Sequence, residues 1–120
     1  MLRKLALTGL LLLLAGIASA ADLTGKWQGS FKFNDQDVPL TLDLKGAKDI
    51  TGTVTGLPSG VVEIKEGKLD GEKLTFWVTT VYDGMTYKLV YRGKVAAGQI
   101  QFSLGTEDGS WGVEFVAKKA

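Results

Sequence analysis

The 120-residue chain contains no cysteine and no histidine, and only two of its residues are proline. It therefore cannot form disulfides, and the absence of both residue types excludes cysteine nucleophiles, histidine-assisted hydrolysis, most zinc sites and haem ligation. Basic and acidic residues nearly balance, at 14 and 13, and no basic block indicates nucleic acid as a partner. We expect no cofactor, no metal site and no nucleic-acid partner.

The first 20 residues have the composition of a secretory signal peptide. Arg3 and Lys4 precede an apolar run from Leu5 to Ile17, and Ala18-Ser19-Ala20 forms a small-x-small cleavage site. A retained anchor is the alternative, but the run is shorter than the roughly 20 residues that span a bilayer as a helix. We predict a secreted or periplasmic protein with a single domain over residues 21–120 and no membrane anchor after cleavage.

From Thr24 onward, apolar residues recur at every second position, which is the pattern of strands with one buried face. Turn signals such as Asp70-Gly71 and Asp83-Gly84 separate eight such runs. In the fourth run, Leu69 leaves the alternation of Val62 and Ile64, which predicts a β-bulge near Gly67.

Eight antiparallel strands in sequence leave two exposed edges unless the sheet closes. Eight strands also make a barrel whose interior is filled by side chains or holds one small ligand. A two-sheet sandwich is the alternative, but it is favoured by long crossover connections, and the loops here are short. We predict an all-β fold, an eight-stranded antiparallel up-and-down barrel.

The first run opens with Leu23-Thr24-Gly25-Lys26-Trp27, and a Gly-x-Trp at this place resembles the calycin superfamily of lipocalins, fatty-acid-binding proteins and avidins. Ile50-Thr51-Gly52-Thr53 is similar to the third-strand motif of the avidins. The chain also resembles a group of short exported bacterial proteins of unassigned activity, which share its Gly-Lys-Trp opening and Ala-Lys-Lys ending. The resemblance implies a calycin-like barrel in which a basic side chain of the last strand, first Lys119 and then Lys118, lies across the Trp27 indole.

Biotin binding does not carry over with this resemblance. Where avidins place polar or small ligand contacts after the motif Trp, this chain has Gly29, Phe31 and Phe33. Where avidins have a Tyr and a Thr in the third strand, it has Val54 and Gly56. A polar ligand group buried without partners costs up to several kcal/mol, so the resemblance implies the scaffold and not the activity.

The inward faces collect aromatic side chains that could line a site for a small hydrophobic ligand. The candidate ligand-binding residues are Trp27, Phe31, Phe76, Tyr87, Tyr91 and Trp111. The same side chains could instead fill the interior, and the small volume of such a barrel favours this reading. Inward glycines such as Gly29 could leave a hollow or let the strands bend, and we favour the bend.

Trp77 falls on the predicted outer face between Thr75 and Thr79, where it is a candidate contact for a partner protein, a glycan or a second copy. The carboxylates lie mainly in turns, and no inward pair is placed for acid–base catalysis. We predict a non-enzymatic exported binding module for a small hydrophobic ligand. The alternative is an interaction protein that uses the outer face around Trp77, and either a monomer or a homo-oligomer fits the sequence.

Signal cleavage after Ala20 predicts a mature protein that begins at Ala21. The intact mass of the protein recovered from the periplasm or the medium should therefore correspond to residues 21–120. Exported protein that still carries Met1 would contradict the prediction.

Overall fold

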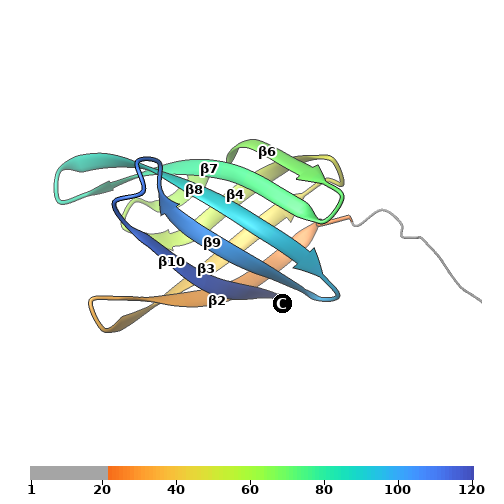
Figure 1. The fold of residues 1–120 in the computed structure, drawn as a ribbon, viewed down its shortest axis with the longest axis horizontal. Coiled ribbons are helices and arrows are strands. Elements are labelled where there is room, and N and C mark those ends of the chain that lie inside the picture. Colours follow the sequence, from red (N-terminus) through yellow and green to blue (C-terminus); the bar gives the residue numbers. More distant parts are fainter. Residues whose placement is uncertain (1–21) are drawn as a thin grey trace, which may run out of the picture.

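The computed structural model describes residues 22–120, in which the regular elements are all strands (Figure 1). In chain order they are β2 (Gly25–Phe33), β3 (Gln36–Lys45), β4 (Asp49–Leu57), β5 (Gly60–Glu63), β6 (Lys65–Asp70), β7 (Lys73–Tyr82), β8 (Met85–Ala96), β9 (Gln99–Thr106) and β10 (Gly112–Lys119). The predicted signal peptide lies outside the described residues.

The sheet closes on itself into a barrel. Strands β3, β2, β10, β9, β8, β7, β6 and β4 are hydrogen-bonded in this order, and the pairing of β3 with β4 completes the ring. All pairings are antiparallel. Because β5 and β6 are two parts of one interrupted strand, the predicted eight-stranded up-and-down barrel is confirmed.

The interruption of the fourth strand at Ile64 directly precedes the predicted β-bulge. The register between β6 and β7 shifts between Lys65 and Lys68, and Glu66 has a φ of 51°, which few non-glycine residues adopt. Gly67 lies against the backbone of β4, where a Cβ atom would collide with the carbonyl oxygen of Ile50. The bulge lets Leu69 face inward again after the change of alternation.

The buried residues alternate along the strands as the sequence predicts. On β3, Leu40, Leu42 and Leu44 are buried, while Asp43 and Lys45 face the solvent. The inward residues of the other strands join them in one hydrophobic core. Each Å² of apolar surface that is buried stabilises the folded state by about 25 cal/mol. This core is therefore the main source of stability in a chain without disulfides.

Trp27 closes one end of this core. Its side chain is only 3% exposed, and its Nε1 donates a hydrogen bond to the carbonyl oxygen of Leu23 at 3.0 Å. The pairing of β10 with β2 places Lys119 opposite Trp27, with Nζ 5.2 Å from the ring centroid. The contact with Lys119 that the calycin resemblance implies is therefore present.

Trp77 lies on the outside of the barrel, half-buried between the inward residues Phe76 and Val78. Its Nε1 donates to the carboxylate of Glu66 at 2.9 Å. The ammonium group of Lys88 lies 4.4 Å from the centroid of its ring. The strand parity therefore separates the two tryptophans correctly, one inside the barrel and one outside.

Trp27→Ala should lower the free energy of unfolding by about 3–5 kcal/mol, because it empties the closed end of the core. Trp77→Ala removes only contacts on the outer face and should cost about 1 kcal/mol or less. Urea titrations of both variants measure the difference. If Trp77→Ala were the more destabilising, the assignment of inside and outside would be wrong.

Candidate ligand-binding site

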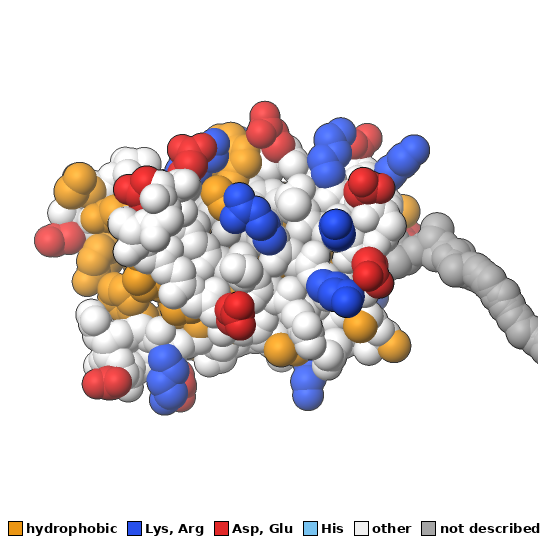
Figure 2. Space-filling view, in the orientation of Figure 1, with side chains coloured by type: hydrophobic (Ala, Val, Ile, Leu, Met, Phe, Trp, Pro, Cys, Tyr) orange, Lys and Arg blue, Asp and Glu red, His pale blue; other side chains and the backbone are white. Residues whose placement is uncertain are grey.

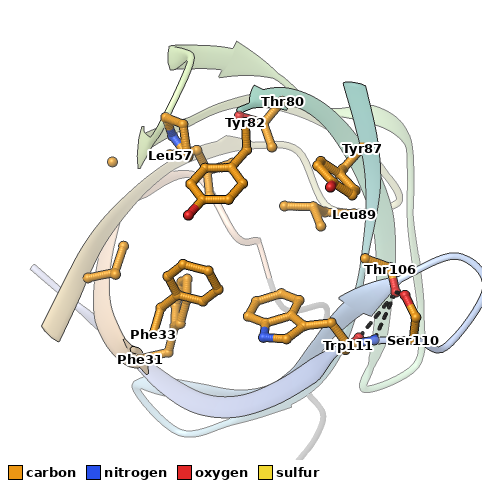
Figure 3. Close-up of a pocket in the computed structure, with 13 residues that line it drawn as sticks. Phe31, Phe33, Leu57, Thr80, Tyr82, Tyr87, Leu89, Thr106, Ser110 and Trp111 are labelled. Atoms are coloured by element: carbon orange, nitrogen blue, oxygen red, sulfur yellow. Dashed lines mark hydrogen bonds between the residues drawn. The ribbon is translucent and has the colours of Figure 1, made fainter. Parts of the chain in front are cut away.

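The barrel is filled at the Trp27 end and hollow at the opposite end, where a cavity of about 500 Å³ opens (Figure 3). Its wall consists of Phe31, Phe33, Val38, Gly56, Leu57, Pro58, Thr80, Tyr82, Tyr87, Leu89, Thr106, Ser110 and Trp111. Small-molecule sites usually have volumes of roughly 300–1,000 Å³. The cavity is therefore large enough for one small ligand.

A chain of aromatic rings fills the barrel between the cavity and Trp27. Phe31 in the cavity wall packs against Phe115, with 6.1 Å between the ring centroids. Phe115 stacks on Phe102 at 5.1 Å, and Phe102 meets the edge of Phe76 at 6.0 Å. The interior is thus filled, as the sequence favoured, along this part of the barrel but not at its open end.

Aromatic rings also form much of the cavity wall. Trp111 meets Phe31 and Phe33 edge-on, with centroid distances of 5.8 and 5.9 Å. Phe33 meets Tyr82 in the same way at 5.7 Å. In Figure 3 these rings surround one open space, and Tyr87 lies across it from Phe33. A ligand in this space would contact rings from four different strands or loops.

The polar side-chain groups of the wall are hydroxyls and the indole N–H of Trp111. Thr80 Oγ1 is 3.2 Å from both the backbone nitrogen and the Oγ of Ser59. The hydroxyl of Tyr82 points toward the open space in Figure 3. None of the residues that line the cavity is charged. The site can therefore surround an apolar group and offer a hydrogen bond near the opening.

The loop between β9 and β10 places Trp111 at the cavity. Thr106 Oγ1 accepts a hydrogen bond from the Trp111 backbone N–H at 3.1 Å, and the Thr106 N–H donates to the Trp111 carbonyl at 3.0 Å. The Asp108 carboxylate accepts from the Ser110 N–H and the Thr106 hydroxyl, both at 2.9 Å. These hydrogen bonds, above all the one from the Ser110 N–H, stabilise the ionised carboxylate and hold the pKa of Asp108 below its ordinary value.

Among the predicted ligand-binding residues, the structure brings Phe31, Tyr87 and Trp111 together in the cavity wall. Trp27, Phe76 and Tyr91 lie instead in the packed core. They support the barrel without lining the cavity.

Most of the wall was missed by sequence reasoning: Phe33, Val38, Leu57, Pro58, Thr80, Tyr82, Leu89, Thr106 and Ser110. Their shared signal is position, because they lie in or near the connections β2–β3, β4–β5, β7–β8 and β9–β10. Alternate connections of an up-and-down barrel fall at the same end. The ends of the runs could therefore have identified this wall.

The inward glycines do not by themselves produce the hollow. A Cβ at Gly29 would lie 2.8 Å from the Phe115 ring and 2.7 Å from the Val116 carbonyl oxygen. Gly29 therefore makes room for the packed ring of Phe115. Gly56 does border the cavity, but its φ of 119° belongs to the register shift between Thr55 and Leu57 in β4.

Comparisons with known proteins identify no family for this barrel. No family model matches the chain, and neither a curated protein nor a solved structure matches it. The assignment to the calycins therefore remains a prediction.

Residues 22–120 include no helix that is long and apolar enough to cross a membrane. Within the same residues, no three carboxylates lie close enough together to hold a metal ion.

Tyr91 has a hydroxyl group that is buried and has no hydrogen-bond partner among the described residues. Its ring stacks on Phe76 with 4.6 Å between the centroids. Burial raises the pKa of Tyr91 above its ordinary value of about 10. The hydroxyl therefore stays neutral in the folded protein at alkaline pH, where the same group ionises in the unfolded chain.

Tyr91→Phe should raise the free energy of unfolding at pH 7 by about 1–2 kcal/mol, because it removes an unsatisfied buried hydroxyl. The wild type should also lose up to about 1.4 kcal/mol for each pH unit above pH 10 through this group, since ionisation favours the unfolded chain. The variant should lack that part of the loss. Urea titrations at pH 7 and pH 11 measure both effects.

Tyr82→Phe is the matched control, because Tyr82 is 44% exposed. It should change stability at pH 7 by less than about 0.5 kcal/mol. A Tyr91→Phe variant that is less stable than the wild type at pH 7 would show that the hydroxyl has a partner in the folded protein.

Proposed function

We propose that the protein is an exported, non-enzymatic binding module of calycin-like type, which takes one small hydrophobic ligand into the open end of its barrel. The observation that supports this function is the cavity, whose wall is largely apolar and lies at an opening between loops. Burial of about 300 Å² of apolar ligand surface there contributes roughly 7 kcal/mol. The loss of ligand freedom offsets part of this, so we expect a Kd of about 0.1 to 1 mM.

The chemistry of the wall favours binding over catalysis. Acid–base catalysis needs a group that exchanges protons near the working pH and lies within hydrogen-bond reach of the substrate. The wall offers the hydroxyls of Thr80, Tyr82, Tyr87, Thr106 and Ser110, and those of Thr80 and Thr106 already bond within the protein. Such groups orient a ligand better than they transform it.

The outer face around Trp77 is the alternative site, and its geometry supports binding less well. The indole N–H is already bonded to Glu66, and the Lys88 ammonium covers the ring. A glycan or partner that stacks on Trp77 would first have to displace Lys88, which also pairs with Glu107 at 3.0 Å. We therefore place the ligand in the cavity.

A neutral apolar dye, N-phenyl-1-naphthylamine, should bind to the wild type at a single saturable site with an increase in fluorescence. Val38→Trp adds a large side chain to the cavity wall and should weaken dye binding at least about tenfold, because it fills the space that the dye needs. Fluorescence titration measures both affinities.

Val95→Trp is the matched control, since Val95 is partly buried but lies outside the cavity wall. Its dye affinity should stay within about twofold of the wild type, with folding of each variant confirmed by urea titration. A wild type without saturable binding, or equal weakening by both substitutions, would contradict the proposed function.

A further inference from the structure

The cavity opens between four loops, 34–35, 58–59, 83–84 and 107–111, which we call the mouth. The charged residues of these loops are Asp35, Asp83, Glu107 and Asp108, and the loops contain no lysine or arginine. The mouth therefore carries charge of one sign only.

The lysines nearest to the mouth along the strands offset only one of these four charges, that of Glu107. Lys32 pairs with Asp37 at 3.1 Å, and Lys88 pairs with Glu107 at 3.0 Å. Within residues 22–120, Asp35 and Asp83 form no ion pair. A potential of one sign at the opening of an apolar cavity attracts ligands of the opposite sign and repels those of the same sign.

The cavity wall also favours a positively charged ligand. Its aromatic members are Phe31, Phe33, Tyr82, Tyr87 and Trp111. The face of an aromatic ring attracts a cation by about 0.5–2 kcal/mol, more where water is excluded. A carboxylate gains nothing from such faces, and no basic side chain lines the cavity to pair with it.

Apolar surface continues outward from the mouth. Tyr82 and Met85 flank the tip of the β7–β8 hairpin and are 44% and 61% exposed, and Val81 beside them is 50% exposed. Figure 2 shows hydrophobic side chains gathered at this end of the molecule. An apolar chain that is longer than the cavity can therefore stay in contact with the protein.

We propose that the ligand of this cavity is an apolar cation, an alkyl or aryl group that carries an ammonium. Its apolar part occupies the cavity, and its ammonium lies at the mouth between the aromatic rings and the loop carboxylates. This inference rests on the proposed function and adds the sign of the ligand's charge to it.

The test compares three ligands of equal chain length, octylammonium, octanol and octanoate, at pH 7 by displacement of N-phenyl-1-naphthylamine. At low salt, the Kd of octylammonium should be at least about threefold lower than that of octanol and at least about tenfold lower than that of octanoate. The advantage should shrink in 0.5 M salt, because exposed charges are screened there. Binding of octanol or octanoate as tight as that of octylammonium would overturn the proposal.

The double variant Asp35→Asn, Asp83→Asn removes two mouth charges while it keeps the turns, since both residues have positive φ values of 63° and 52°, which asparagine also adopts. It should weaken octylammonium binding about threefold or more and leave octanol binding unchanged. The control variant Asp43→Asn, Asp70→Asn removes two exposed charges away from the mouth. Equal weakening in both variants would overturn the role of the mouth.

The outcomes separate this inference from the proposed function. If the dye and octanol bind but octylammonium has no advantage, the cavity binds apolar ligands and only the inference on charge fails. If neither the dye nor any of the three ligands binds, the proposed function fails and the inference fails with it.

Discussion

The closure of the sheet between its first and last strands is the constraint on which the rest of the barrel depends. Its paired residues are Lys118 with Gln28 and Lys119 with Trp27, and the Ala120 N–H adds a bond to the Lys26 carbonyl. Without disulfides, this short seam holds because Trp27 packs beneath it and Lys119 lies over the ring. An open sheet would expose both strand edges and the apolar face that forms the core.

Closure gives the barrel two unlike ends. The Trp27 end is packed, and its side chains provide the stability that a small domain needs, about 5–15 kcal/mol in total. The opposite end holds the cavity, the aromatic wall and the acidic loops. Residues of the mouth can therefore differ in chemistry without loss of the core, which is the arrangement that we expect of a binding module on a stable scaffold.

Much of the fold could be predicted from the sequence, because strand alternation fixes which face each side chain occupies. It gave the barrel, the bulge near Gly67 and the opposite placement of Trp27 and Trp77. Alternation cannot tell depth along the barrel axis. Leu89 and Tyr91 share one face of β8 and both belong to the core, yet Leu89 lines the cavity and Tyr91 does not. The ends of the runs indicate which side chains lie near an opening, but they do not show whether those side chains fill the space between distant strands.

The central claim is that an apolar ligand enters at the mouth while the Trp27 end stays packed. The chain has three tryptophans, one at the closed end, one on the outer face and one in the cavity wall. Their indole N–H signals in a ¹H–¹⁵N NMR titration with octanol test the claim most directly. The Trp111 signal should shift to saturation while those of Trp27 and Trp77 stay in place, whereas a shift led by Trp27 or Trp77, or no shift at all, would contradict it.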